Sequence, residues 1–273
     1  MDLDGYALVV GGGSGIGKAC AEAFATYGAT GVVIADIDTT AAKDVTLRCK
    51  TMARTSGFQS KSMHIDVTQE DSVQLVVNDM KNLFGRIDYC VICAGIGAEN
   101  GAEISETSLS EFQRFLDINV LGSFIVTRAV CAAMRLQDPK PAAVASPERG
   151  TTRGAIVHMG SLASILPSPG IVPYTTSKHA VLGLSRNSAL DNIRHQIRVN
   201  CVCPSWVDTP MVQRATKHIP GLDAMINRHA PMGRVARPSE IADAVIFLCS
   251  PRSSYTTGCA LVIDGGIRIG SKL

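Results

Sequence analysis

Seven short apolar runs, rich in β-branched residues, alternate along this chain with longer segments of helical periodicity. Their apolarity is continuous rather than alternating, which is typical of strands buried on both faces of a sheet. The runs are Tyr6–Val10, Gly31–Ala35, Met63–Val67, Ile87–Ala94, Ala155–Met159, Ile197–Val202 and Ala260–Ile263. The helical segments are Ile16–Tyr27, Ser72–Phe84, Leu109–Met134, Thr175–Ile193 and Ser239–Leu248. Because parallel neighbours need crossover connections, this order predicts an α/β fold, a doubly wound parallel sheet with helices on both faces.

No boundary divides this pattern, so we expect one domain over residues 1–273. One composition shift, at 137–153, is rich in Pro, Ala and charge and predicts a surface-loop insertion between a helix and a strand. We find no repeat and no apolar stretch long enough for a transmembrane helix. A formal net charge of +2 gives no electrostatic reason to expect nucleic acid or an anionic membrane as a partner.

The nine cysteines are an odd number, and the chain opens without an apolar signal segment. A reducing compartment is therefore favoured over a disulfide framework. Two close pairs, Cys90 with Cys93 and Cys201 with Cys203, lie inside apolar runs and lack a second ligand pair at zinc spacing. We expect core packing there and no metal site.

A glycine-rich loop follows the first apolar run and leads directly into a helical segment. Glycines allow a tight turn and let backbone N–H groups approach a pyrophosphate, whose charge is favoured at a helix N-terminus. The residues that we expect to bind a dinucleotide here are Gly11, Gly13, Ser14, Gly15, Ile16 and Gly17. The context of strand before and helix after makes an ordinary loop the weaker interpretation.

The second run leads to Asp36, nineteen residues past Gly17. A carboxylate there accepts hydrogen bonds from the adenosine ribose hydroxyls and repels a 2′-phosphate. The next residues are Ile37 and Asp38, with no cation, so NAD(H) is favoured over NADP(H). Asp66 is expected to end the third strand and, with the Val67 backbone, to meet the adenine edge; an Asp that only starts a turn fits the spacing equally well.

Tyr174 and Lys178 stand four residues apart at the head of a helical segment, so both project from one face. A free phenol titrates at about pH 10, and a nearby ammonium group stabilises its phenolate. Such a pair moves the proton of a secondary alcohol. Ser161, thirteen residues upstream at a strand end, is placed to hydrogen-bond the same substrate oxygen.

These motifs together resemble the short-chain dehydrogenase/reductase superfamily over essentially the whole chain. Besides the glycine loop, Asp36, Ser161, Tyr174 and Lys178, the matching residues are Asp66-Val67, Ala94-Gly95, Asn119, Asn200–Pro204, Thr209-Pro210 and Asp264-Gly265-Gly266. The resemblance implies a Rossmann-type sheet of about seven strands in one domain, commonly assembled as a homotetramer or homodimer.

Carried over by resemblance, Tyr174 is the catalytic acid/base and Ser161 polarises the carbonyl. Lys178 holds the nicotinamide ribose hydroxyls, and Asn119 bends its helix and supports a proton-relay water. The resemblance also assigns cofactor contacts to a further set of positions: Ala94, Gly95, Pro204, the Val207 backbone and Thr209.

Four residues, in three motifs, depart from the family pattern. Ile92-Cys93-Ala94-Gly95 stands where the family has Asn-Asn-Ala-Gly, Val10 replaces a threonine before the first glycine, and Ser205 replaces a glycine after Pro204. None removes a catalytic group, so we expect tuning of the activity rather than its loss.

The segment near 210–234 resembles the variable substrate lid of the family, and nothing in the sequence identifies the substrate. It contains Met211, Met225 and Met232, and also His218 and His229. Contact with substrate is one interpretation of the two histidines, and surface positions on a mobile helix pair are the favoured one. The chain ends in Ser271-Lys272-Leu273, which is a peroxisomal address read by an import receptor. We therefore expect a peroxisomal protein, with the cytoplasm as the alternative.

The resulting hypothesis is an NAD(H)-dependent oxidoreductase of CH–OH and C=O groups that interconverts a secondary alcohol and a ketone on a small to mid-sized apolar substrate. One alternative is a non-redox isomerase, cyclase or dehydratase on the same fold. Another is a non-catalytic nucleotide-binding scaffold, which would have no need of the intact Asn119, Ser161, Tyr174 and Lys178 set.

Overall fold

A seven-stranded parallel sheet forms the centre of the protein, in the order β3-β2-β1-β4-β7-β8-β9. The computed structural model describes residues 3–98, 101–218, 221, 226, 228 and 230–270. The strands are β1 Tyr6–Val10, β2 Gly31–Asp36, β3 Gln59–His64, β4 Tyr89–Ile92, β7 Gly154–Met159, β8 Ile197–Pro204 and β9 Ala260–Ile263. The strand order reverses between β1 and β4, which pair in parallel with Ala7 opposite Tyr89. Ligands of such sheets bind outside the carboxyl ends of the strands at this switch point.

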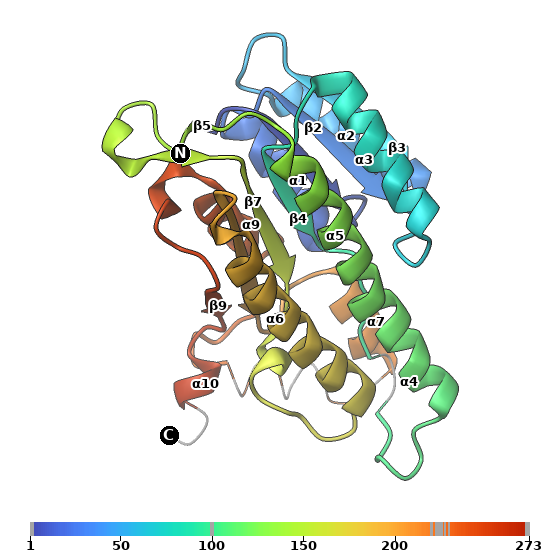
Figure 1. Ribbon diagram of the computed structural model, residues 1–273. Coiled ribbons are helices and arrows are strands. Elements are labelled where there is room, and N and C mark those ends of the chain that lie inside the picture. The colour runs from blue at the N-terminus through green and yellow to red at the C-terminus, as the bar shows by residue number, and fades with distance from the viewer. Residues whose placement is uncertain are drawn as a thin grey trace.

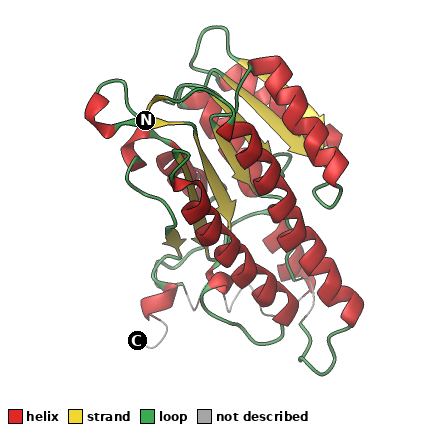
Figure 2. Cartoon of the chain, in the orientation of Figure 1, coloured by secondary structure: helices red, strands yellow, loops and turns green. Residues whose placement is uncertain are grey.

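Helices cover both faces of the sheet, as the alternating pattern predicts (Figures 1 and 2). They are α1 Gly15–Thr26, α2 Thr39–Met52, α3 Glu70–Phe84, α4 Leu109–Phe115, α5 Gly122–Arg135, α6 Val172–Ile193, α7 Pro210–His218, α9 Pro238–Cys249 and α10 Ile267–Gly270. One core cluster joins the sheet to α1, α2 and α9, and a second joins the other face to α3, α5 and α6. The Rossmann-type fold class is therefore confirmed.

The third strand differs from its prediction. We expected a buried apolar run at Met63–Val67, whereas β3 spans Gln59–His64 and alternates exposed with less exposed side chains. It pairs only with β2, at the edge of the sheet. Asp66 consequently lies two residues beyond the strand rather than at its end. An edge strand need not be apolar on both faces, which is why the apolar pattern misplaced it.

The residues from Leu109 to Arg135 form one continuous helical stretch in which α4 and α5 are joined by a π-helical turn, Leu116–Leu121. The stretch is 27 residues long and contains an 18-residue window with a mean hydropathy of 1.5, so it is long and apolar enough to cross a membrane, contrary to the sequence-based expectation. Half of its most apolar window is buried inside the fold, as in the core helix of a globular protein. Figure 1 shows α5 lying against the sheet beside α6.

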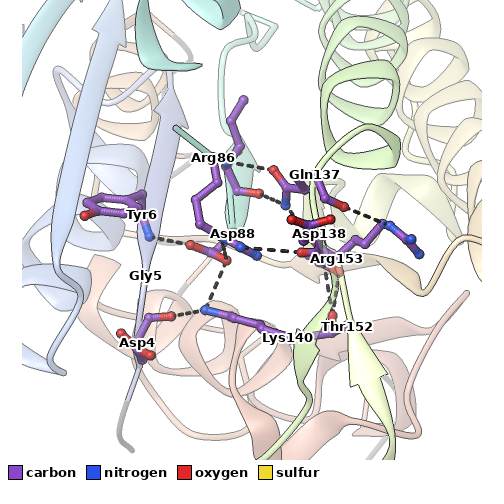
Figure 3. Close-up of polar contacts among 12 residues, drawn as sticks. Asp4, Gly5, Tyr6, Arg86, Asp88, Gln137, Asp138, Lys140, Thr152 and Arg153 are labelled. Atoms are coloured by element: carbon purple, nitrogen blue, oxygen red, sulfur yellow. Dashed lines mark hydrogen bonds and ion pairs between the residues drawn. The ribbon is translucent and has the colours of Figure 1, made fainter. Parts of the chain in front are cut away.

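The segment 137–153, expected as a surface loop, carries a small antiparallel hairpin of β5 Lys140–Pro141 and β6 Thr151–Thr152. It is anchored to the amino-terminal ends of the strands around Asp88, whose side chain is 1% exposed (Figure 3). Asp88 accepts from the Tyr6 N–H at 2.9 Å and pairs with Arg86 at 2.8 Å and Lys140 at 3.0 Å. Through Lys140, the segment is thereby tied to the start of β1 at Tyr6 and to Asp88, the residue before β4.

Replacing Asp88 by Ala is expected to lower the free energy of unfolding by about 2–3 kcal/mol, because it leaves two cations and a backbone N–H without their shared acceptor. Glu22→Ala is the matched control, since its partner Arg48 is a 55% exposed side chain and surface pairs contribute about 0–1 kcal/mol. Urea unfolding of both variants measures the difference. Equal losses in the two variants would contradict the role given to Asp88.

Candidate functional site

A cavity of about 830 Å³ opens at the carboxyl ends of the central strands. It reaches from the glycine loop after β1, past the ends of β2 and β4, to the head of α6 and the start of α7. Most residues predicted to bind cofactor or substrate line it: Gly11, Ser14, Gly15, Ile16, Gly17, Asp36, Ile37, Asp66, Val67, Ala94, Gly95, Ser161, Tyr174, Lys178, Pro204, Val207 and Thr209. Two other predicted site residues, Gly13 and Asn119, do not line the cavity.

The glycine loop is shaped by close backbone approaches. The Gly11 N–H donates to the Ala35 carbonyl at 2.8 Å, and Gly11 has φ of +75°, a conformation that favours glycine. A Cβ on Gly17 would lie 1.9 Å from the Gly11 carbonyl oxygen. The first turn of α1 can therefore pack on the loop only with glycine at 17, and Ser14 stands at the N-cap with its backbone extended.

Asp36 is held against this loop at the end of β2. Its Oδ2 accepts from the Gly13 N–H at 2.8 Å and its Oδ1 accepts from the Asp38 N–H at 3.0 Å. The next side chain, Ile37, is 67% exposed at the cavity. It is Asp38, not Asp36, that caps α2, accepting from the N–H groups of Thr40 and Ala41.

Asp66 both starts a turn and lines the cavity. Its Oδ1 accepts from the backbone N–H and hydroxyl of Thr68 at 2.9 and 2.7 Å, so it does start a turn. The same residue lines the cavity with Val67. Across the switch point, the Ala94 N–H donates to the Val10 carbonyl at 3.0 Å, which holds Ala94 and Gly95 against the glycine loop.

Tyr174 and Lys178 project from the first turns of α6 into the cavity, as their spacing predicts. The Lys178 Nζ lies 5.7 Å from the centre of the Tyr174 ring and donates to the Met159 carbonyl at 2.9 Å. That bond uses one of the three ammonium protons and fixes the side chain, which is 8% exposed. The Tyr174 ring packs edge-on against Phe115 at 6.3 Å.

Ser161 follows β7 and caps a short 3₁₀-helix, Leu162–Ser164. Its Oγ accepts from the Ala163 N–H at 3.1 Å, while its own N–H donates to Ser164 Oγ at 3.1 Å. One local hydrogen bond thereby fixes the Oγ and the other fixes the Ser161 backbone, and no acceptor for the hydroxyl proton is found in the part of the chain that the structure describes. Sequence reasoning did not single out Ser164, although Ser-x-x-Ser is a capping pattern.

Asn119 lies in the π-helical turn and is 1% exposed. Its Oδ1 accepts from the Ile96 N–H at 2.8 Å, and its Nδ2 donates to the Ile96 carbonyl and to Ser177 Oγ at 3.1 and 2.9 Å. The side chain thus ties the loop after β4 to the residue preceding Lys178. It does not line the cavity, so its link to the chemistry passes through Ile96 and α6.

The segment after β8 closes the other side of the cavity. Thr209, 7% exposed, packs against Gly15, where a Cβ would lie 3.3 Å from the threonine methyl carbon. Val207 forms a parallel bridge with Ala236. Of the lid proposed near 210–234, α7 and Met211 line the cavity, whereas Met225 and His229 lie outside the described residues, as does the side chain of His218.

Sequence reasoning missed part of the cavity wall. The additional apolar residues include Ile96, Leu162, Leu166, Ile171 and Ile267, together with Trp206, the single tryptophan of the chain. They come from the segments that follow β4, β7, β8 and β9, so no periodic pattern marks them. Cys90, Cys201 and Cys203 lie in the core as predicted, whereas Cys93 is partly exposed and lines the cavity.

His158, on β7 next to Met159, is a fully buried imidazole that sequence reasoning also missed. Burial, and secondarily the positive charge of Lys178, lowers its pKa from 6.5 to about 4. Nε2 lies 2.7 Å from Thr127 Oγ1, and Nδ1 has no partner within the described part of the chain. The imidazole is therefore neutral in the folded protein at physiological pH.

A lowered histidine pKa makes the folded state less stable in acid, because the unfolded chain takes up the proton first. The contribution of His158 is complete above pH 6.5 and is lost as the pH falls from 6.5 towards about 4. At pH 5 this loss is about 2 kcal/mol. Urea unfolding at pH 7.5 and pH 5 measures how far the free energy of unfolding falls between the two pH values. This fall should be about 2 kcal/mol smaller in His158→Gln than in the unsubstituted protein. An equal fall in both proteins would show that His158 is not the group responsible.

Comparison with known proteins agrees with this geometry. A family model described as enoyl-(acyl carrier protein) reductase matches residues 10–268. The chain is 59% identical to the short-chain dehydrogenase fogB of Aspergillus ruber, over 97% of each chain. It is 37% identical to the 2,5-dichloro-2,5-cyclohexadiene-1,4-diol dehydrogenase of Sphingobium indicum, over 97% of this chain and 98% of that protein. A crystal structure of a short-chain type dehydrogenase/reductase from Mycobacterium marinum superposes with a TM-score of 0.85 at 32% identity, covering 98% and 97% of the two chains.

Proposed function

The chain belongs to the short-chain dehydrogenase/reductase family, whose members are oxidoreductases that use NAD(P) and act on small molecules, and from this premise we propose that it interconverts a secondary alcohol and a ketone with NAD(H). One observation carries the proposal: the glycine loop and the Ser161, Tyr174 and Lys178 side chains line one continuous cavity. The dinucleotide loop and the proton-transfer groups therefore face the same space.

The residues present fit a dinucleotide. A Cβ on Gly13 would lie 2.9 Å from Asp36 Oδ2, so glycine is needed for the loop to approach the end of β2. The N-terminus of α1 faces the cavity through Ser14 and Gly15, where a pyrophosphate is favoured. A bound NAD(H) supplies or accepts the hydride. Gly11 to Gly17 would hold its phosphates, Asp36 its adenosine ribose, and Lys178 with Thr209 its nicotinamide end.

In the proposed reaction, three side chains act at the ketone oxygen of the substrate. Together they transfer a proton there and stabilise the charge that develops. Tyr174 donates its phenolic proton to the ketone oxygen as the alkoxide develops, and takes it back in the reverse direction. Ser161 donates a hydrogen bond to the same oxygen from a hydroxyl already aimed by Ala163. Lys178, fixed by the Met159 carbonyl, places a positive charge near the phenolate that Tyr174 becomes.

The experiment that tests the function follows absorbance of NADH with a panel of cyclic and acyclic ketones and secondary alcohols. Oxidation or formation of NADH with a panel member is the expected result. Conversion of a panel member without any change in NADH would instead favour an isomerase, cyclase or dehydratase. Binding of NADH without turnover of any compound would favour a nucleotide-binding scaffold.

A cyclic secondary alcohol or its ketone is the substrate class that we propose. The relative from Sphingobium indicum is named a dehydrogenase of a cyclic diol. In this chain, the cavity that Tyr174 lines is also lined by Leu162, Ile171, Trp206 and Met211. Apolar walls of this kind favour a ring with few polar groups over a sugar or a charged acid.

Asp36 is the basis for proposing NAD(H) rather than NADP(H). Asp36→Ser should weaken NADH binding about tenfold, because it removes two charge-assisted hydrogen bonds to the ribose, and it should narrow the preference over NADPH. Quenching of Trp206 fluorescence in the cavity measures both dissociation constants. Asp38→Ser is the matched control: serine preserves the cap of α2, and the cofactor preference should not change. Tighter binding of NADPH than NADH by the unsubstituted protein would overturn the assignment.

The oligomeric state and the cellular location are also proposals. We propose a homotetramer or homodimer, which sedimentation of the purified protein tests. The peroxisomal address Ser271-Lys272-Leu273 lies outside the described residues. A fluorescent reporter ending in these residues should collect in peroxisomes, and a diffuse signal would favour the cytoplasm.

A further inference from the structure

A buried chain of polar side chains runs from β7 to the π-helical turn, behind the cavity. His158 lies next to Thr127 on α5, and Thr127 and Ser123 follow Asn119 at intervals of four residues. These four side chains are 0%, 3%, 5% and 1% exposed. A core position of this kind is ordinarily apolar and a buried polar group needs a partner, so the bonds that link these residues, two of them through backbone carbonyls, call for an explanation.

The direction of the hydrogen bonds follows from the donor count. The Thr127 hydroxyl donates its single proton to the Ser123 carbonyl at 2.6 Å. Thr127 Oγ1 must then accept from the His158 Nε2–H, at 2.7 Å. His158 is consequently the neutral tautomer with its proton on Nε2. The hydrogen bonds of this group therefore run in one donor-to-acceptor direction, from the imidazole towards Asn119.

The next bond reaches the π-helical turn itself. Ser123 Oγ donates to the Asn119 carbonyl at 2.6 Å. Within the turn, the Gly122 N–H bonds to the Asp117 carbonyl five residues back, so the regular i to i−4 ladder is interrupted there. Hydroxyls that bond to the carbonyl four residues earlier bend a helix and satisfy its carbonyls. Two such bonds in succession satisfy the Asn119 and Ser123 carbonyls and shape the bend at the interruption.

The π-helical turn positions two parts of the cavity, which are the wall at Ile96 and the first turn of α6. The Asn119 side chain brackets Ile96 through both the N–H and the carbonyl, and it also donates to Ser177 Oγ. Ser177 donates to the Tyr174 carbonyl at 2.8 Å and immediately precedes Lys178. A shift of the turn would therefore be transmitted to the wall at Ile96 and to the first turn of α6.

We propose that His158, Thr127 and Ser123 are positioning residues for the proposed reaction. They hold the π-helical turn in register, so that Asn119 keeps the first turn of α6 and its Tyr174 and Lys178 in place. The inference rests on the proposed function for its effect on turnover, whereas its effect on the Ile96 amide does not depend on any reaction.

Paired substitutions test the proposal. His158→Leu removes one hydrogen bond of the chain, and Thr127→Val removes two. His158→Gln retains a donor at the position of Nε2, and Thr127→Ser retains the hydroxyl. Ile156→Val is the matched control, because Ile156 is fully buried on β7, two residues before His158, and has no polar atom in its side chain. Steady-state kinetics use NAD with the secondary alcohol of highest turnover in the panel.

His158→Leu and Thr127→Val should lower kcat about tenfold while KM for NAD changes less than about threefold, since misplacement of a positioned group costs turnover. His158→Gln, Thr127→Ser and Ile156→Val should keep kcat within about threefold of the unsubstituted protein.

Hydrogen–deuterium exchange provides the readout that needs no substrate. The Ile96 amide, whose proton is donated to Asn119, should exchange about tenfold faster in Thr127→Val than in Thr127→Ser. Unchanged exchange and unchanged kcat in both His158→Leu and Thr127→Val would overturn the proposal, as would an equal loss of kcat in Ile156→Val. If His158→Leu does not fold, the Thr127 pair decides. Failure of the reaction assay with faster exchange in Thr127→Val would overturn the proposed function and leave this inference standing.

Discussion

Tyr174→Phe is expected to lower kcat by about 10³-fold, because a positioned general acid/base contributes about 10² to 10⁴ to the rate. Phenylalanine keeps the ring, and so keeps the edge-on contact with Phe115 at 6.3 Å. The dissociation constant of NADH should change less than about threefold, since the glycine loop and Asp36 are untouched. Initial rates of NADH oxidation and quenching of Trp206 fluorescence measure the two quantities.

Tyr255→Phe is the matched control, because Tyr255 is fully exposed and does not line the cavity. It should turn over at the rate of the unsubstituted protein. Turnover by Tyr174→Phe within about tenfold of that rate would remove the proton-transfer role from Tyr174, since general acid/base groups contribute more than this. A Tyr174→Phe variant that no longer bound NADH would point instead to a structural role for the phenol.

Gly17→Ala is expected to weaken NADH binding by about 100-fold or more, because the loop must open to admit a methyl group and no longer presents its N–H groups to the pyrophosphate. The added Cβ would lie 1.9 Å from the Gly11 carbonyl oxygen and 3.1 Å from the Gly12 Cα. Both contacts are with backbone, so no side-chain rotation relieves them. Fluorescence titration with NADH measures the affinity, and circular dichroism checks that the variant is folded.

Gly183→Ala is the control for this substitution. Gly183 also lies in a helix, α6, but a Cβ there meets no atom within 4 Å. Alanine in a helix interior is more stable than glycine by about 0.5–1 kcal/mol, so NADH affinity should stay the same and thermal stability should not fall. An unchanged affinity in Gly17→Ala would show that the loop does not hold the cofactor.

The fold could be predicted from the sequence because apolar runs mark strands that are buried on both faces. The bounds of Tyr6–Val10 and Ala260–Ile263 were correct to the residue. The same signal failed at β3, an edge strand with Lys61 and two serines, and it passed over α2, whose buried stripe is narrow. For α2 a usable signal existed, since Asp38 and the following residues form an N-cap.

The candidate site was predictable only as far as motifs reach. Glycine spacing and the interval between Tyr174 and Lys178 placed both groups correctly at the cavity. Nothing local announces the π-helical turn at Leu116–Leu121, because the bonds that hold it come from α5, from Ile96 and from α6. For the same reason His158 reads in the sequence as one more residue of a buried strand.

The short strand β4 separates two regions with different tasks. Asp88 immediately precedes it and Cys93 immediately follows it, so the hairpin clamp and the cavity lie about 16 Å apart along the strand direction. Effects of substitutions at this separation usually add independently. Changes at the cavity that alter substrate specificity can therefore lower the free energy of unfolding without affecting the hairpin. Tighter anchoring of the hairpin at the opposite end of β4 can then restore that free energy.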